Sequence, residues 1–163
     1  MDISSYISGF VDGEGCFCVS FQPSKRHCFG WEVRPSFSVS QNQDRAQLLY
    51  ILRDRWKCGT IRPDRSDKTI KFEVRALLDL NEKVVPHFLR YPLISKKQED
   101  VVLFSEICSL MKVKQHRNLQ GLSQIVNLAM RMNSTGKRKY TGSEILTSLH
   151  ADEGIVYATG NCG

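Results

Sequence analysis

The spacing of hydrophobic residues changes along the first part of the chain. Over residues 2–15 the apolar side chains recur at helical intervals, which predicts a short helix capped by Ser4 or Ser5. Over 16–23, and again over 31–40, apolar and polar residues alternate, which predicts two strands that each bury one side. A short basic connection joins these strands, so we expect an antiparallel hairpin with one face open to water.

The rest of the chain repeats this order of helix and hairpin. Asn42 is expected to cap the next helix and Gly59 to end it. The remaining elements are expected as strands at 60–64 and 69–74 and as helices at 81–91, 95–111, 118–132 and 143–149. This order predicts an α+β fold: an αββαββα core with a four-stranded antiparallel sheet, plus C-terminal helices. We expect one domain over residues 1–163, with its core at about 3–145 and an irregular C-terminal tail at about 151–163.

The composition is that of an ordinary globular protein, with 41% hydrophobic and 25% charged residues. No apolar run is long enough to span a membrane, and the N-terminus lacks the pattern of a signal peptide. We therefore expect no membrane partner and an intracellular, non-secreted protein, in a bacterial cytoplasm or in an organelle (chloroplast or mitochondrion). The cysteines form no CxxC pair and are expected as reduced thiols: Cys16, Cys18, Cys28, Cys58, Cys108 and Cys162.

Positive charge gathers in three connecting segments of the chain. The net charge of +6 and the isoelectric point near 9.1 favour a polyanionic partner. The basic residues of these segments are Lys25, Arg26 and His27, then Arg62, Arg65 and Lys68, then Lys137, Arg138 and Lys139. Contacts of such residues with phosphates supply much of the affinity of proteins for DNA.

The polar sides of the two predicted hairpins form one face of the sheet. They carry hydrogen-bonding side chains of several kinds: Ser20, Gln22, Ser24, Glu32, Arg34, Ser36, Ser38, Ser40, Thr60, Arg62, Asp64, Thr69, Lys71 and Glu73. Side chains of these types read base edges, and a β-ribbon fits the major groove of DNA. Any antiparallel sheet also has a polar, wet side, so the pattern alone leaves both interpretations open. The flanking basic segments favour nucleic acid.

The first predicted helix carries small residues on one face and two acids at its end. Ser5, Gly9 and Gly13 are spaced four apart, which suits close approach of another backbone. Asp12 and Glu14 fall at the C-terminal end, where the helix dipole repels anions. These carboxylates are therefore neutralised by a cation, either a divalent ion or a lysine, or are simply solvated.

The segment 7–15, Ile-Ser-Gly-Phe-Val-Asp-Gly-Glu-Gly, resembles the LAGLIDADG motif of homing endonucleases. Gly9, Asp12 and Gly15 match the motif outright, and Glu14 keeps its final acid with one additional methylene. The expected αββαββα order is also that of the family core, so the resemblance covers roughly residues 3–145. It implies a metal-dependent enzyme that cuts double-stranded DNA at a specific site.

The resemblance also implies a symmetric homodimer, because this chain has a single motif. In such proteins two motif helices pack together through small residues, here Ser5, Ser8, Gly9, Asp12 and Gly13. A two-fold symmetric protein is expected to recognise a long, near-palindromic target.

Several residues are expected in the active site by the same resemblance. Glu14, with Gly13 and Asp12, matches the metal-binding end of the motif, where two or more Mg²⁺ ions per dimer are implied. Asp12 matches the acid that more often has a structural role. Gln41 would position solvent, Arg45 would lie near the scissile phosphate, and Lys96 or Lys97 would reach the active-site solvent. Either lysine is equally well read as part of a basic helix turn.

Two other functions use the same fold. An RNA-binding maturase, which assists intron splicing, would use the basic surface without needing Glu14 or Lys97. A non-catalytic DNA-binding regulator is the second alternative. A small-molecule enzyme is the weakest reading, because the sequence has no glycine-rich phosphate loop and no nucleophile motif.

Overall fold

The computed structural model describes residues 1–63 and 68–159, and within these the side chains up to residue 151. The strands are β1 Gly15–Pro23, β2 Trp31–Asn42, β3 Thr60–Pro63 and β4 Thr69–Val74. The helices are α1 Ile3–Glu14, α2 Gln47–Trp56, α3 Leu77–Asp79, α4 Val85–Arg90, α5 Lys97–Lys112, α6 Leu119–Arg131 and α7 Gly142–Thr159. Short 3₁₀ turns lie at Gln43–Arg45 and Gln115–Arg117, and a π-helical turn lies at Leu80–Val84. The predicted α+β fold is confirmed.

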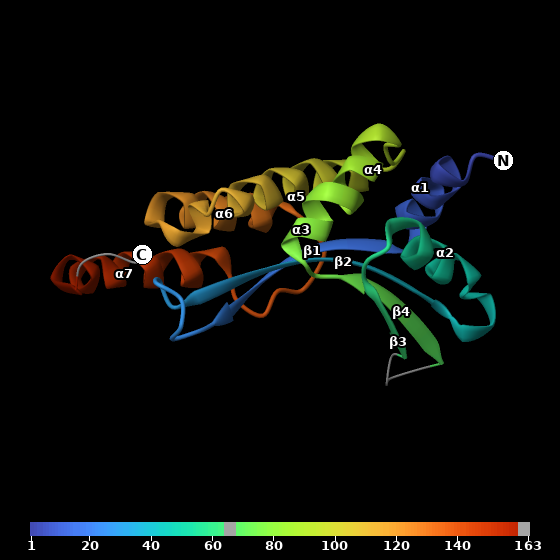
Figure 1. Cartoon of the computed structure of the whole chain (residues 1–163). Helices are drawn as coiled ribbons and strands as arrows, with labels where there is room; N and C mark the ends of the chain where they lie inside the picture. The colour runs from blue at the N-terminus through green and yellow to red at the C-terminus, as the bar shows by residue number, and fades with distance from the viewer. Residues whose placement is uncertain (64–67, 160–163) are drawn as a thin grey trace.

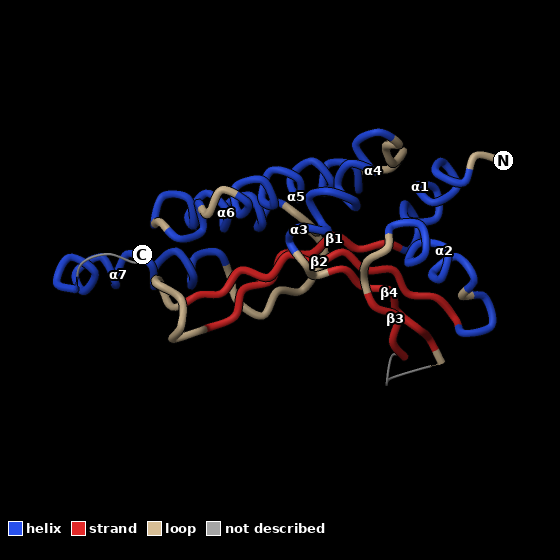
Figure 2. Tube along the Cα trace, viewed as in Figure 1, coloured by secondary structure: helices blue, strands red, loops and turns tan. Residues whose placement is uncertain are grey.

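The sheet is antiparallel, with the strand order β1-β2-β4-β3. Helices α4, α5 and α6 cover one face of it, α1 and α2 lie at one end, and α7 lies at the other (Figures 1 and 2). The opposite face carries no helix among the described residues (Figure 2). One face thus packs on the core, and the other is not covered by any helix of the described residues.

The alternation of the strands places apolar residues toward the helices, as predicted. Phe17, Phe37 and Phe72 are almost completely buried on that side. The ring of Phe17 lies 5.0 Å from that of Phe37, 5.3 Å from Phe88 of α4 and 5.5 Å from Phe104 of α5, between centroids. Aromatic pairs of this kind contribute about 1 kcal/mol each beyond simple burial. This cluster joins the edge strand β1 and its neighbour β2 to α4 and α5.

Several helix boundaries differ from those expected. Helix α2 ends at Trp56, with Lys57 and not Gly59 as its C-cap. Asp2, and not Ser4 or Ser5, caps α1: its carboxylate accepts hydrogen bonds from the amides of Ser4 at 3.2 Å and Ser5 at 3.1 Å. Asn42 makes no capping bond, because a 3₁₀ turn separates it from α2. The helix expected over 81–91 begins at Leu77 and passes through a π turn before Pro86, which lacks the amide proton that a regular helix uses.

The expectation of an irregular tail from 151 is wrong as far as Thr159, because α7 runs from Gly142 to Thr159. The helix starts with a capping box. The Thr141 hydroxyl accepts from the amide of Glu144 at 3.1 Å, and the Glu144 carboxylate accepts from the amide of Thr141 at 2.6 Å. The helix then passes Gly154 although glycine costs about 1 kcal/mol relative to alanine in a helix interior.

The cysteines follow the expectation of free thiols with one exception. Cys16, Cys18, Cys58 and Cys108 are free, whereas Cys28 is disulfide-bonded, so the expectation is wrong there. Cys162 falls outside the described residues. Burial raises the pKa of the Cys108 thiol to about 12. Among the described residues, no helix is both long and apolar enough to cross a membrane.

Candidate active site and nucleic-acid interface

The C-terminal end of α1 leads directly into the sheet. Gly15 closes the helix through its amide, which donates to the Val11 carbonyl, and then pairs with Val39 as the first residue of β1. A Cβ atom at Gly15 would lie 2.5 Å from the Val11 Cγ1 atom and 2.8 Å from the Val11 oxygen. Only glycine therefore permits this sharp passage from helix to strand, which fixes Glu14 at the edge of the sheet.

Lys97 reaches the end of α1 from the start of α5. Its Nζ atom donates hydrogen bonds to the carbonyl of Val11 at 3.1 Å and to that of Asp12 at 2.7 Å. These carbonyls lie at the negative end of the α1 dipole, where a cation is favoured. Lys96 is exposed and precedes the helix. Of the two lysines expected near the active site, the structure brings Lys97 to the motif helix.

Asp12 holds the segment that carries Lys97. Its carboxylate accepts hydrogen bonds from the amides of Ile94 at 3.1 Å and Ser95 at 3.0 Å, and from the Ser95 hydroxyl. These bonds, the one from the Ser95 hydroxyl first, lower the pKa of Asp12 below its ordinary value. Both carboxylate oxygens of Asp12 therefore accept hydrogen bonds from within the chain.

Glu14 is exposed and has no hydrogen bond or ion pair with any residue whose placement is described. It is the acid at this edge that is left for an external cation. No three His, Cys, Asp or Glu side chains of the described residues come together as a metal site. One chain thus supplies a single free carboxylate, with oxygen donors of the kind that Mg²⁺ prefers, and further ligands would come from another molecule.

Gln41 and Arg45 lie at the same end of the sheet. Gln41 stands two residues beyond Val39, the pairing partner of Gly15, and its Oε1 atom accepts from the Asn42 amide at 3.0 Å. Arg45 lies in the 3₁₀ turn that follows β2, with its side chain 76% exposed. Strand pairing therefore brings Gln41 close to the level of Glu14, and Arg45 extends from the same edge into solvent.

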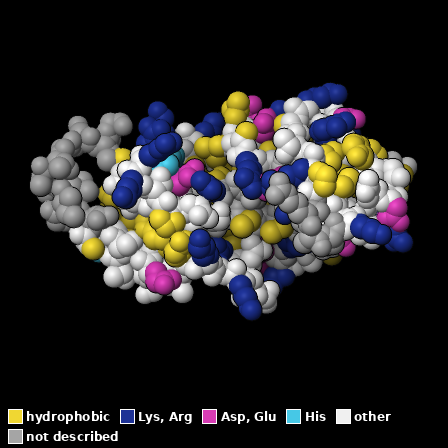
Figure 3. Space-filling model, turned by 90° about the horizontal axis from the view of Figure 1, so that it is seen from below, with side chains coloured by type: hydrophobic (Ala, Val, Ile, Leu, Met, Phe, Trp, Pro, Cys, Tyr) yellow, Lys and Arg dark blue, Asp and Glu magenta, His cyan; other side chains and the backbone are white. Residues whose placement is uncertain are grey.

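The open face of the sheet carries the polar residues that the alternation predicted. Figure 3 looks onto the underside of the molecule and shows lysine and arginine side chains dispersed over it, with few acids. The register aligns these positions in rows across the strands, such as Cys16, Ser38, Glu73 and Thr60. Most of the residues expected to contact nucleic acid lie on this face or in its bordering loops: Ser20, Gln22, Ser24, Lys25, Arg26, His27, Glu32, Arg34, Ser36, Ser38, Ser40, Thr60, Arg62, Lys68, Thr69 and Lys71. Asp64 and Arg65 fall outside the described residues.

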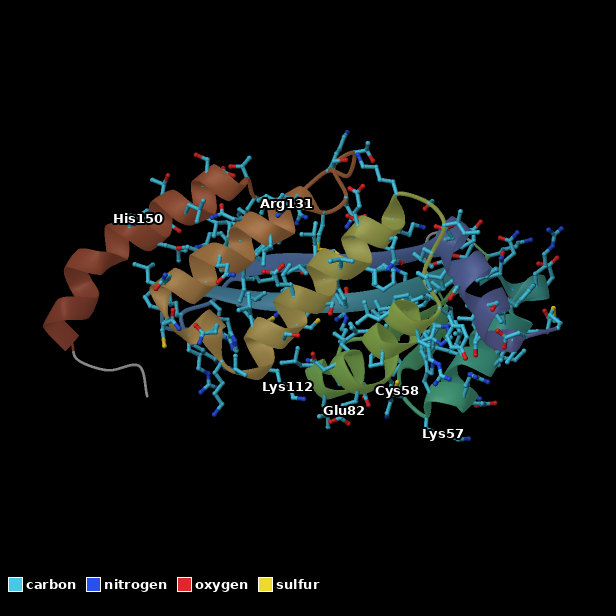
Figure 4. The ribbon with its side chains drawn as sticks, turned by 90° about the horizontal axis from the view of Figure 1, so that it is seen from above. Lys57, Cys58, Glu82, Lys112, Arg131 and His150 are labelled. Carbon is cyan, nitrogen blue, oxygen red and sulfur yellow. The ribbon has the colours of Figure 1, made fainter. Side chains whose placement is uncertain are left out.

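The helical side differs from this face. Figure 4 shows the molecule from above, with α5 and α6 crossing obliquely over the strands and with Glu82, Lys112 and Arg131 at the margins of the helical layer. Charges of both signs are exposed there, and the side chains of the core lie beneath.

Arg138 has a role that the sequence did not indicate. Its guanidinium donates to the carbonyl of Val19 at 3.0 Å, to that of Met132 at 3.2 Å, and to that of Ala129. Asn133 likewise donates to the Phe17 carbonyl at 2.7 Å. Phe17 and Val19 lie on the outer edge of β1, where carbonyls have no strand partner. Arg138 therefore links the end of α6 to the outer edge of β1. Its neighbours Lys137 and Lys139 are exposed.

Only part of the small-residue face of α1 is open. Ser5, Gly9 and Gly13 are exposed, and a Cβ atom added at either glycine would meet nothing within 4 Å. Ser8 is buried and donates its hydroxyl proton to the Tyr91 carbonyl at 2.6 Å. Ser8 and Asp12 therefore make contacts inside the chain, and the open face consists of the other three small residues.

Arg75 was missed by the sequence analysis. It follows β4 at an alternating position after Lys71 and Glu73, so it faces the open side, and its Nε atom lies 3.1 Å from the Glu73 carboxylate. The continued alternation beyond the predicted end of the strand at residue 74 was the signal that would have identified it.

Comparison with known proteins supports a common origin for these features. The family model described as LAGLIDADG endonuclease matches residues 7–108. A probable intron-encoded endonuclease of Neurospora crassa is 37% identical over 130 residues, which are 79% of this chain and 29% of that protein. The chain thus spans less than a third of the length of this relative.

Solved structures of homing endonucleases share the fold. The homing endonuclease I-TnaI is 32% identical with a TM-score of 0.78, over 91% of this chain and 96% of its own. The LAGLIDADG homing endonuclease I-LtrWI, bound to target DNA, is 32% identical with a TM-score of 0.79, over 84% of this chain and 46% of its own.

Proposed function

The chain belongs to the LAGLIDADG endonuclease family, and from that premise we propose that it cuts double-stranded DNA at a specific site. The observation that carries this proposal is the end of α1. There Glu14 is an acid without a partner among the described residues, beside a lysine that Asp12 and Ser95 hold in place. The open face of the sheet starts at this same edge, so DNA bound to that face would pass the candidate catalytic groups.

The open face supports the choice of DNA as substrate. It combines Arg, Gln, Ser and Thr side chains suited to base edges with basic loops suited to phosphates. I-LtrWI, which has this fold, was solved bound to its target DNA. Phosphate contacts would provide affinity and the side chains of the strands would provide selectivity.

The active form is proposed to be a homodimer that joins two copies of α1. The exposed face at Ser5, Gly9 and Gly13 carries no side chain larger than that of serine, so another helix can approach closely. The chain matches almost all of I-TnaI but about half of I-LtrWI, which is consistent with two copies of this unit in a complete enzyme. A two-fold axis between the α1 helices would bring two Glu14 carboxylates together and would require a near-palindromic target.

Hydrolysis of a phosphodiester is proposed to use Mg²⁺ held by Glu14 of both copies, with carbonyl oxygens near Gly13. When bound, Mg²⁺ would polarise the phosphate and make a water molecule more acidic. Lys97 has two of its three N–H bonds directed at α1 carbonyls and would present positive charge to the reacting phosphate. Gln41 would orient the attacking water through its side-chain amide, and Arg45 would offset phosphate charge from the edge of the sheet.

Cleavage of a randomised duplex library in Mg²⁺ tests this proposal. The wild-type protein is expected to enrich one near-palindromic site, and Glu14→Gln is expected to bind that site without cutting it. Glu99→Gln, which removes an exposed carboxylate from the first turn of α5, is the matched control and should cut normally. Cutting by Glu14→Gln would overturn the assignment of Glu14. Site-specific binding without cutting by the wild type would favour a regulator, and selective binding of intron RNA alone would favour a maturase.

A further inference from the structure

Glu73 is a carboxylate embedded in the face that is proposed to meet DNA. It lies on β4 between Ser38 of β2 and Thr60 of β3, and only 9% of its side chain is exposed. A negative charge at this place would repel the phosphates of a bound duplex. Its burial shows that it makes its contacts inside the protein.

Two arginines enclose this carboxylate. The Arg62 guanidinium donates to Glu73 Oε2 at 2.7 Å. Arg75 approaches the same oxygen with its Nε atom at 3.1 Å and donates to Oε1 at 3.2 Å. The arginine side chains are 52% and 64% exposed, so their remaining donors face solvent while their shared anchor does not. Together, Glu73, Arg62 and Arg75 carry one net positive charge.

We propose that Glu73 is a positioning residue that fixes Arg62 and Arg75 so that they read guanines at neighbouring base pairs of each half-site. This inference rests on the proposed function, and it names the bases that this part of the face selects. A guanidinium has five donors, and a bidentate pair of them matches the O6 and N7 acceptors of guanine in the major groove. One or two donors of each arginine are used by Glu73, which leaves a free pair on each.

The ion pairs order these side chains before DNA arrives. A free arginine side chain loses rotamer entropy when it is fixed, which weakens binding to every sequence. Arginines held by Glu73 have already lost part of that freedom during folding, so more of the contact energy remains for discrimination. Arg75 also lines a hollow beyond the end of β4, between Gln22, Arg34 and Ser36 of the open face and Leu77 and Met111 of the helical side, which gives its free donors access to a ligand.

Lys71 provides the contrast within the same surface. It pairs in register with Arg62, but it forms no ion pair with an acid in the described part of the chain. A mobile ammonium suits phosphate, for which no fixed geometry is needed. Glu73 thus fixes Arg62 and Arg75, the two side chains whose geometry matters for base recognition.

Replacing each arginine by lysine separates charge from geometry. Arg62→Lys and Arg75→Lys keep the net charge, so the slope of binding affinity against salt concentration should stay within experimental error of the wild type. Each variant should lose about tenfold in preference for guanine at one position of the half-site, and each at a different position. The measurement is a binding and cleavage profile over all single substitutions of the selected target.

Glu73→Gln tests the anchor itself. It should weaken the guanine preference at both positions and bind unrelated DNA more tightly, because the face gains one positive charge. The matched control is Asp54→Asn, which removes the partner of Arg53 on α2, makes the same change of charge, and should leave the profile unaltered. Melting temperatures of all variants identify any that fail to fold, and the two lysine variants test the proposal independently.

The outcomes distinguish this inference from the proposed function. A wild-type protein that selects no target would overturn the proposed function. If the wild type selects and cuts a target but the lysine variants keep its guanine profile, Arg62 and Arg75 read no guanine and the inference fails. An unchanged profile in Glu73→Gln, with altered profiles in the lysine variants, would show that the arginines do not need their anchor.

Discussion

Replacing Arg138 by alanine should destabilise the fold although the residue stands in a basic surface segment. The guanidinium donates to the carbonyls of Val19, Ala129 and Met132, and thereby joins the edge of β1 to the end of α6. A hydrogen bond from a charged donor contributes about 1.5–3 kcal/mol, and water at the rim replaces part of it after truncation. Counting about 1 kcal/mol for each bond, we expect a loss of about 3 kcal/mol in the free energy of unfolding.

For a chain of this length the melting temperature changes by about 2–4 °C per kcal/mol, so the expected decrease is about 6–12 °C. Calorimetry or urea unfolding measures it. Lys137→Ala is the control, because Lys137 is exposed and should change stability by less than about 0.5 kcal/mol. An Arg138→Ala protein that melts like the wild type but binds DNA with a reduced salt dependence would refute this reasoning. Arg138 would then contact phosphate, as its sequence neighbours suggested.

Three further predictions test other parts of the structure. Lys97→Met should reduce the single-turnover cleavage rate by about a hundredfold or more, because Lys97 reaches α1. Lys96→Met should reduce it by less than about threefold. Equal losses in the two variants would contradict this. Burial, with Arg55 nearby, lowers the pKa of His87 below its ordinary value of 6.5, so its neutral form stabilises the fold fully above pH 6.5 and this contribution is lost as the pH falls toward the lowered pKa. The free energy of unfolding should therefore be lower at pH 5 than at pH 7.5, and the difference should be smaller in His87→Phe. An equal difference in the variant would show that other groups cause the pH dependence. A thiol reagent at pH 8 should label exposed Cys16 much faster than buried Cys108 in the folded protein, as mass spectrometry of labelled peptides can measure; comparable rates would show that the core opens readily.

The sequence alone determined the order of elements and the two sides of the sheet. Alternation with period two depends only on neighbouring residues, so the pattern by itself assigns Phe17, Phe37 and Phe72 to the core. The motif around Glu14 was also visible, because its glycines and acids are contiguous in the chain. The helix boundaries were less certain. The capping box at Thr141 and Glu144 was present in the sequence, but the helix was expected only over 143–149, whereas α7 continues to Thr159.

Only the tertiary structure decided which polar residues act within the chain and which remain free. Asp12 meets Ser95 across 83 positions, and Arg138 meets Val19 across 119. No local pattern distinguishes Arg138 from Lys137, because side-chain direction there depends on where the edge of β1 lies. Glu73 is a second example. In the sequence it is one of several polar residues on the solvent side of a strand, and only the structure shows that Arg62 and Arg75 form ion pairs with it. Hydrophobic periodicity is a property of neighbours in sequence, whereas the partners of charged side chains are set by packing between distant segments.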